Sequence, residues 1–183
     1  DAEALSALLV RAAENHDEVA RAVRRGAASP TERLGVLRRE VDRGLRTRRF
    51  LGYRESAEWA QEAAPVVDAL AQAVAVEPSL ELVALLERAV GHVIKVILRA
   101  DDSDGLIGGL AQRLLDLHEQ ACAAGVAEPV ALARWMVRFT FEDQDFFMVD
   151  PVRYADALGD KGVAAYRDAV ATRSAGAHGY ARP

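Results

Sequence analysis

Residues 78–99 carry apolar side chains around most of the circumference of the helix that they are expected to form. The rest of that circumference is a narrow polar stripe made of Glu81, Arg88, His92, Lys95 and Arg99. A helix with so little polar surface has to be buried on several sides. We therefore expect this segment to lie at the centre of a helical domain, with the other elements packed around it.

Apolar residues recur at helical spacing along the rest of the chain, and no stretch keeps the period of two that a strand requires. Ser29-Pro30-Thr31-Glu32 combines a capping hydroxyl, a proline in the first turn and a carboxylate three residues after the cap, which predicts a helix start. This helix is expected to run to about Arg49. Further helices are expected before residue 27 (two), over 56–73, over 107–125, from Pro129, after Asp150 and after Asp160. Pro65 is expected to kink one of them.

These eight or nine helices and their short connections predict an all-α fold of stacked antiparallel helical hairpins, either a closed bundle or a short solenoid of the TPR or HEAT type. We expect a single domain over residues 1–173. Residues 174–183 contain Gly and Ala and are expected to form a loose tail. Because the sequence does not begin with Met, we expect it to be a piece of a longer protein.

Composition limits the function classes. The chain has 23 Lys and Arg against 28 Asp and Glu, a net charge of −5, which argues against a general binder of nucleic acid or anionic membranes. Cys122 is the only cysteine, so the chain can form neither an internal disulfide nor a Cys-rich zinc module. No apolar run approaches the roughly 20 residues of a membrane span. We expect a cytoplasmic protein without a cofactor.

The region from Arg33 to Arg54 is the strongest candidate for binding. It holds eight arginines against only Glu40 and Asp42, a local charge of +6. Arg39, Arg43 and Arg46 follow at four- and three-residue spacing and are expected to share one helical face. Guanidinium groups suit phosphates and carboxylates, so this face could bind an acidic partner. The alternative interpretation is an ordinary solvated face whose arginines pair with carboxylates elsewhere in the domain.

Two segments resemble metal sites. Residues 101–105 read Asp-Asp-Ser-Asp-Gly, like part of a calcium loop, but the twelfth position is Gln112 where such a loop requires Glu. We interpret this turn as a helix start capped by Ser103 or Asp104. His118 and Cys122 lie one helical turn apart, which is close to a zinc pattern. His92 is the one other mid-domain His that could join them, and a partly buried His with an inert thiol is the preferred interpretation.

Glu142, Asp143 and Asp145 lie between aromatic residues and could form a metal or general-acid cluster. We interpret the segment instead as a helix end with turn-forming Asp, its Phe side chains tucked under the loop. The sequence contains no Gly-rich phosphate loop, no serine nucleophile elbow and no His–carboxylate relay. We therefore expect no enzymatic activity.

Three stretches together show a resemblance to a known family: Leu85 to Gly105 (LLERAVGHVIKVILRADDSDG), Leu114 to Cys122 (LLDLHEQAC) and Tyr154 to Arg167 (YADALGDKGVAAYR). They resemble the uncharacterised helical region that accompanies SWIM-type zinc fingers in bacterial proteins. The resemblance covers roughly the C-terminal half of the chain. The Cys-x-Cys and Cys-x-His pairs of such fingers are absent from this sequence, so it implies neither a metal site nor DNA binding here. It implies an accessory helical domain of a larger protein.

The sequence therefore predicts a non-catalytic interaction or scaffold domain that binds an acidic protein segment through Arg39, Arg43 and Arg46. The alternative is an accessory nucleic-acid-associated domain that acts through the same arginine-rich helix. A third possibility is an enzyme that uses the His118 and Cys122 region or the acidic segment 142–145. The sequence does not specify the oligomeric state.

Overall fold

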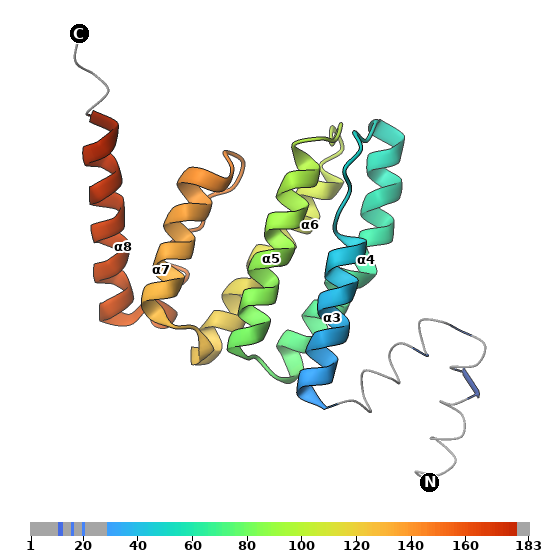
Figure 1. Cartoon of the computed structure of the whole chain (residues 1–183), viewed down its shortest axis with the longest axis horizontal. Coiled ribbons are helices and arrows are strands. Elements are labelled where there is room, and N and C mark those ends of the chain that lie inside the picture. The colour runs from blue at the N-terminus through green and yellow to red at the C-terminus, as the bar shows by residue number, and fades with distance from the viewer. Residues whose placement is uncertain (1–10, 13–15, 17–19, 21–28, 179–183) are drawn as a thin grey trace. The chain divides into compact units, whose positions relative to one another are not determined.

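The computed structural model describes residues 11–12, 16, 20 and 29–178. The helical elements within them are α3 (Pro30–Gly44), α4 (Tyr53–Val76), α5 (Leu80–Ile97), α6 (Leu106–Ala121), a π-helical turn η1 (Cys122–Val126), α7 (Pro129–Arg138), a second π-helical turn η2 (Phe139–Asp143) and α8 (Ala155–His178). The β-type pairing in this part of the chain is one isolated bridge, between Leu51 and Ala100. The predicted all-α fold is therefore confirmed (Figure 1). None of the described helices has the length and apolarity needed to cross a membrane.

The chain divides into two compact units, residues 1–40 and 41–183, where the sequence predicted one domain over 1–173. The boundary falls inside α3. The two helices that were expected before residue 27 lie outside the described residues, so the total of eight or nine helices stays a prediction.

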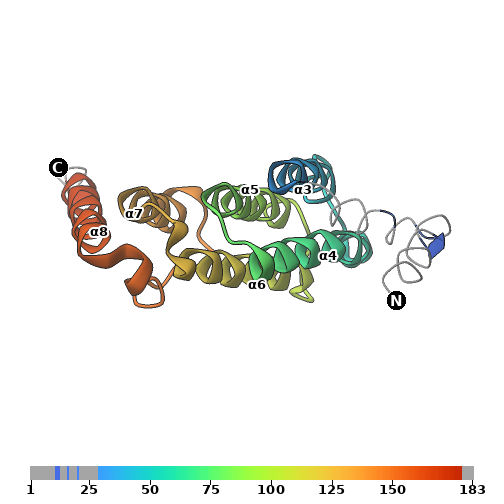
Figure 2. The same cartoon turned by 90° about the horizontal axis from the view of Figure 1, so that it is seen from below.

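Within residues 41–183 the helices form two layers. Figure 2 shows α5 and α7 in one layer and α4 and α6 in the other. α6 packs against both α4 and α5, and α8 packs against α7. From α4 to α7 the chain reverses direction at each connection, as the sequence predicted for consecutive helices with short links (Figure 1).

α7 and α8 run in the same direction, which corrects the expectation of antiparallel hairpins throughout. A Cβ built on Gly162, near the start of α8, would lie 3.0 Å from the carbonyl oxygen of Pro129, at the start of α7. The two helices can be parallel because residues 139–154 carry the chain back along α7 before α8 begins (Figure 1). Parallel neighbours need such a long return, whereas an antiparallel pair needs only a short loop.

α5 contains more buried residues than any other described helix, in keeping with its apolar sequence. Its buried residues are Leu82, Val83, Leu85, Leu86, Ala89, Val90, Val93, Ile94 and Val96. Burial of so many large apolar side chains, each worth about 1.5–3 kcal/mol relative to exposure, makes this helix the main contributor to the core. Its start is fixed by Ser79, whose hydroxyl accepts a hydrogen bond from the Leu82 amide at 3.2 Å.

Local signals placed several helix ends correctly. The Ser29 hydroxyl accepts from the Glu32 amide at 3.3 Å, and the Glu32 carboxylate accepts from the Ser29 amide at 2.8 Å, which completes the predicted capping box. Pro129 begins α7. Gly125 takes a positive φ of 77° at the end of η1, a conformation that favours glycine and ends the helical segment there.

The end of α3 was predicted wrongly. The helix stops at Gly44, five residues before Arg49. Residues 45–52 leave the helix because Leu51 pairs with the end of α5: its amide donates to the Arg99 carbonyl at 2.8 Å, and its carbonyl accepts from the Asp101 amide at 2.8 Å. Leu51 is buried by this crossing. A long-range contact therefore overrides the local helical pattern.

Two caps also differ from their predictions. α4 begins at Tyr53 and not after Ser56, because the Glu55 carboxylate accepts from the Gly52 amide at 3.0 Å. Ser56 is buried inside the helix, and α4 continues through Pro65. The start of α6 is capped by Asp102, in place of Ser103 or Asp104. Its two carboxylate oxygens accept from the amides of residues 107 and 108, at 2.9 and 2.8 Å.

The C-terminal helices are joined. The two helices expected after Asp150 and Asp160 form one element, α8, which is interrupted at Gly159 with a φ of 51°. α8 continues to His178, so residues 174–178 are helical and the expected tail boundary at Ser174 lies within the helix. Residues 179–183 lie outside the described residues.

Candidate functional site

The polar stripe of α5 is basic over its second half. Arg88, His92 and Lys95 follow at intervals of four and three residues and therefore share one face of the helix. Arg99 lies four residues beyond Lys95, in the turn after α5. The side chains of Arg88, Lys95 and Arg99 are exposed, and His92 is partly buried. Cations therefore line the α5 stripe from its middle to its end.

Asp42 connects the last turn of α3 to this stripe. One carboxylate oxygen, Oδ1, accepts from Arg88 Nε at 2.6 Å and lies 3.0 Å from His92 Nε2. These hydrogen bonds, first that from Arg88 and then that from His92, lower the pKa of the Asp42 carboxyl to about 2. Asp42 is therefore ionised at neutral pH and anchors the side chains of Arg88 and His92 on α5.

Burial lowers the pKa of His92, and the positive charges of Arg88 and Arg46 act in the same direction, while the hydrogen bond to Asp42 opposes them. His92 is therefore mainly neutral at pH 7. Arg46, which follows α3, is exposed as well. We call Arg46, Arg88, Lys95 and Arg99 the basic surface; Asp42 is the carboxylate bound within it.

The structure places the three arginines of the predicted face differently from the sequence. Arg39 and Arg43 lie one turn apart on α3, and both are exposed. Arg46 is exposed but follows the end of the helix, so it shares no helical face with them. Arg39 belongs to the unit 1–40, whereas Arg43 and Arg46 belong to the unit 41–183. Within the described residues neither Arg43 nor Arg46 forms an ion pair, whereas Arg49, from the same arginine-rich region, pairs with Glu55 at 3.4 Å. Both interpretations of the region therefore stay predictions.

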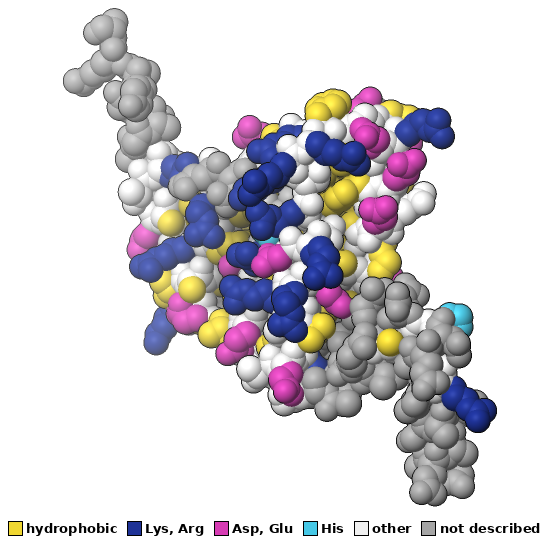
Figure 3. All heavy atoms as spheres, turned by 45° about the vertical axis from the view of Figure 1, so that its right-hand side comes forward, with side chains coloured by type: hydrophobic (Ala, Val, Ile, Leu, Met, Phe, Trp, Pro, Cys, Tyr) yellow, Lys and Arg dark blue, Asp and Glu magenta, His cyan; other side chains and the backbone are white. Residues whose placement is uncertain are grey.

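The α5 and α7 layer is more basic than the α4 and α6 layer. α5 and α7 together contain four Lys and Arg against two Glu, whereas α4 and α6 contain two Arg against six Asp and Glu. Figure 3 shows Lys and Arg side chains gathered in a band across one face of the molecule. A net charge of −5 for the chain therefore conceals a layer of opposite sign.

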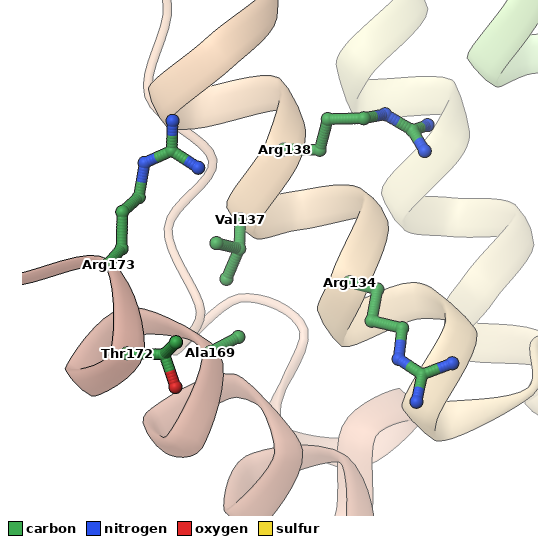
Figure 4. Close-up of a pocket in the computed structure, with 6 residues that line it drawn as sticks. All are labelled: Arg134, Val137, Arg138, Ala169, Thr172 and Arg173. Atoms are coloured by element: carbon green, nitrogen blue, oxygen red, sulfur yellow. The ribbon is translucent and has the colours of Figure 1, made fainter. Parts of the chain in front are cut away.

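A hollow of about 360 Å³ lies between α7 and α8, lined by Arg134, Val137, Arg138, Ala169, Thr172 and Arg173. Its arginines do not converge: Figure 4 shows Arg134 and Arg138 pointing away from Arg173. The Arg173 guanidinium donates to the Phe141 carbonyl at 3.2 Å, and its central carbon lies 5.8 Å from the centre of the Phe141 ring. The hollow is therefore not arranged to hold a single anion. Arg134 and Arg138 instead add two exposed cations to the α5 and α7 layer.

His118 lies at the centre of a buried polar cluster that joins three helices and the turn before α8. The ring is fully buried, with Nδ1 2.9 Å from the Tyr154 hydroxyl and Nε2 3.7 Å from a Glu87 carboxylate oxygen. The indole of Trp135 packs on it, with ring centres 4.1 Å apart. The Tyr154 hydroxyl also lies 3.4 Å from the Leu115 carbonyl. These contacts satisfy a polar group that would otherwise be costly to bury.

The chemistry of this cluster is that of a packing contact. Burial, followed by the charges of Glu87 and Glu119, raises the pKa of the Cys122 thiol to about 12, so the thiol stays protonated at neutral pH. Its sulfur lies 3.8 Å from His118 Nε2 and is fully buried. Burial also raises the pKa of Tyr154. A nucleophilic Cys needs a lowered pKa and access to a substrate, and Cys122 has neither.

The structure does not assemble the metal-site candidates. His92 bonds to Asp42 and does not join His118 and Cys122. Gln112, at the twelfth position of the calcium-like loop, donates to Asp116 at 3.2 Å. Among the described residues, no group of three or more His, Cys, Asp or Glu could hold a metal ion.

The acidic aromatic segment is organised by Gln144, which the sequence did not single out. Its buried side-chain amide donates to the carbonyls of Phe139 and Phe147, at 3.1 and 2.6 Å, and its side-chain oxygen accepts from two amides of the loop. Phe141 and Phe146 are about half exposed, at 48% and 56%, so they are not tucked under the loop as expected. Asp145 is exposed. Gln144 could not be found from the sequence, because hydrogen bonds between a side chain and the backbone of its own loop leave no recognisable sequence pattern.

Comparison with known proteins found no family model, no curated protein and no solved structure that matches this chain. The resemblance to the helical region of SWIM-type zinc-finger proteins therefore stays a prediction. The function has to be proposed from the geometry of the molecule itself.

Proposed function

We propose that this chain is a non-catalytic interaction module of the cytoplasm that binds an acidic segment of another protein. The observation that carries the proposal is the basic surface, which has four exposed cations, one of which, Arg88, is paired with the carboxylate of Asp42. Arg43 adds exposed charge at the end of α3, and Arg134 and Arg138 add it on α7. The side chains with reactive chemistry, His118 and Cys122, are buried; the His118 ring is hydrogen-bonded to the Tyr154 hydroxyl and contacts the Cys122 sulfur. This supports a binding role over catalysis.

The arrangement of the helices supports the same role. Two layers of stacked helices, as in short helical-repeat arrays, present an extended face on which many side chains act together. We propose that the helices of this chain form a short array of this kind. The basic surface follows α5 over about 16 Å from Arg88 to Arg99, at about 1.5 Å per residue. A ligand that runs along it is therefore a chain segment with several carboxylates and not a single small anion.

The test measures the affinity of the whole chain for a fluorescent peptide of Glu, Gly and Ser by anisotropy. The variant Lys95→Ala/Arg99→Ala should weaken binding roughly fivefold to thirtyfold, because each lost contact between exposed charges is worth up to about 1 kcal/mol. The variant Arg39→Ala/Arg43→Ala/Arg46→Ala tests the arginines of the sequence prediction and should weaken binding as well. Affinity should fall as salt is added, since the contacts are exposed.

The matched control is Lys161→Ala/Arg167→Ala, which removes the same two residue types from exposed positions of α8. It should bind the peptide as the wild type does. Equal weakening by the control, or no binding of the peptide by the wild type, would contradict the proposal. A short DNA duplex is measured in parallel: tighter binding of the duplex, lost in the Lys95→Ala/Arg99→Ala variant, would identify the alternative function in nucleic-acid association.

A further inference from the structure

Four large apolar side chains are exposed at the end of the molecule where α5 ends and where α4 and α6 begin. Their exposed fractions are 69% for Phe50, 50% for Tyr53, 60% for Leu98 and 45% for Leu106. We call these four residues the apolar end. Single exposed apolar residues are ordinary, but a group of them at one place marks a contact surface.

Backbone hydrogen bonds hold two of the segments that carry these residues side by side. Leu51, next to Phe50, forms a bridge with Ala100, two residues after Leu98, through a pair of 2.8 Å hydrogen bonds. Side chains alternate in an extended segment, so burial of Leu51 directs its neighbour Phe50 outward. Asp104, two residues before Leu106, acts on the Tyr53 hydroxyl and raises its pKa. The exposure of Phe50 is therefore built into the fold.

The apolar end is continuous with the basic surface. Leu98 lies between Lys95 and Arg99 in sequence, and the Arg99 carbonyl accepts from the Leu51 amide next to Phe50. The top edge of Figure 3, where this end of α5 lies, shows hydrophobic side chains next to Lys and Arg side chains. A ligand chain that lies along the basic surface therefore reaches Phe50 and Leu98 when it passes Arg99.

We infer that the acidic segment bound by this module carries bulky apolar residues next to its carboxylates, and that these residues dock on Phe50 and Leu98. The inference rests on the proposed function, whose ligand it defines further. The carboxylates supply attraction and orientation, whereas desolvation of the apolar end supplies affinity that salt does not weaken.

The neighbouring charges argue for such a partner and against a second copy of this chain. A symmetric contact between two apolar ends would bring Lys95 and Arg99 of one copy towards the same cations of the other. Like charges facing each other across an interface oppose association. Carboxylates of an acidic partner complement Lys95 and Arg99. Asp101 and Asp104 are exposed on the Tyr53 and Leu106 side of the apolar end, so the carboxylates belong on the Arg99 side, next to Phe50 and Leu98.

The test uses two fluorescent peptides with the same Glu, Gly and Ser sequence, one of which ends in Phe-Leu and the other in Ser-Ser. The wild-type chain should bind the Phe-Leu peptide about tenfold more tightly. This advantage should persist at high salt. It should disappear in Phe50→Ala/Leu98→Ala, while the affinity for the Ser-Ser peptide stays as in the wild type.

The matched control is Leu80→Ala/Phe146→Ala, which replaces the same two residue types at exposed positions away from the basic surface (54% and 56%). It should keep the full preference for the Phe-Leu peptide. Equal affinities of the wild type for both peptides, or loss of the preference in the control, would overturn the inference and leave the proposed function standing. If neither peptide binds, the proposed function fails together with it.

Sedimentation of the wild type without peptide gives a further readout. We expect a monomer. A dimer that dissociates in Phe50→Ala/Leu98→Ala would show that a second copy covers the apolar end, which also overturns the inference.

Discussion

The imidazole of His118 contacts side chains from separate parts of the chain. Glu87 comes from α5, Trp135 from α7 and Tyr154 from the turn that precedes α8. A fully buried ring in such a cluster fixes the relative positions of its neighbours, because displacement of Tyr154 would leave an imidazole nitrogen unsatisfied and displacement of Trp135 would remove the packing on the ring. We attribute to His118 a structural role, in which it joins the return segment before α8 to the core.

The hydrogen bond of the Tyr154 hydroxyl can be tested by a replacement that removes only one heavy atom, the hydroxyl oxygen. Replacement Tyr154→Phe keeps the ring and removes the partner of His118 Nδ1. We expect the free energy of unfolding to fall by about 1–2 kcal/mol, because the buried imidazole nitrogen loses its hydrogen bond. Urea denaturation followed by circular dichroism measures this difference.

The control is Tyr166→Phe, since Tyr166 is partly exposed in α8 and its hydroxyl forms no hydrogen bond with the described residues. Its effect should stay within about 0.5 kcal/mol. Equal effects of the two replacements would show that the Tyr154 hydroxyl is not part of a stabilising cluster.

At the scale of elements, the parallel packing of α7 and α8 depends on one glycine. A Cβ on Gly162 would approach the Leu158 Cδ2 atom to 2.9 Å and the Pro129 carbonyl oxygen to 3.0 Å. The second of these atoms belongs to the backbone of α7 and cannot rotate away. Gly162 therefore sets the closest distance between the two helices.

Replacement Gly162→Ala should lower the free energy of unfolding by about 1–3 kcal/mol, because an added methyl group forces the helices apart. Gly109→Ala, in α6, is the matched control: no atom lies within 4 Å of the position that its added methyl group would take. In an open helical position Ala is favoured over Gly, so this variant should gain about 0.5–1 kcal/mol. Thermal or urea unfolding gives both values, and a loss in both variants would mean that close packing at Gly162 is not the cause.

Most helices could be predicted because their signals are local. Pro129, Gly125 and the Ser29–Glu32 capping box act within a turn of the chain, and the apolar circumference of residues 78–99 needs no knowledge of neighbours. The end of α3 could not be predicted, because it depends on the pairing of Leu51 with Ala100. The parallel packing of α8 on α7 was not predicted either, because it also depends on contacts between segments that are far apart in the sequence.

The candidate site could be predicted in part. The charge excess of residues 33–54 and the polar stripe of α5 are visible in the sequence. Their connection through Asp42 is not, because Asp42 and Arg88 are 46 positions apart. The sequence also placed Arg46 on a helical face that ends two residues before it. Side-chain pairs that depend on how two helices cross cannot be read from either helix alone.

At the scale of the whole molecule, two groups of the basic surface make stability depend on pH in the same direction. The folded pKa values of both Asp42 and His92 are lowered. The unfolded chain therefore binds more protons than the folded chain as the pH falls, which favours unfolding. The contribution of His92 is present above pH about 6.5 and is lost as the pH falls through its lowered pKa. That of Asp42 is present above pH about 4 and is lost towards pH about 2.

Urea unfolding measured from about pH 7 to about pH 2 checks this dependence, because this range covers roughly the ionisation of both His92 and Asp42. The wild type should lose about 1 kcal/mol through Asp42 below pH about 4, after allowance for solvent screening of this partly exposed pair. Asp42→Asn cannot ionise, so its stability should fall less over the same interval. Parallel curves for the two proteins would show that the contacts of Asp42 with Arg88 and His92 do not stabilise the fold.

The opposite charges of the two helix layers give residues 41–183 an electric dipole across their thickness. Beyond about 8–10 Å, the screening length at ordinary ionic strength, salt screens the net negative charge of the chain. Within that distance the nearer layer dominates, and the dipole exerts a torque on an approaching acidic molecule. This torque turns the carboxylates towards α5 before contact. The fold thereby selects the orientation of an encounter.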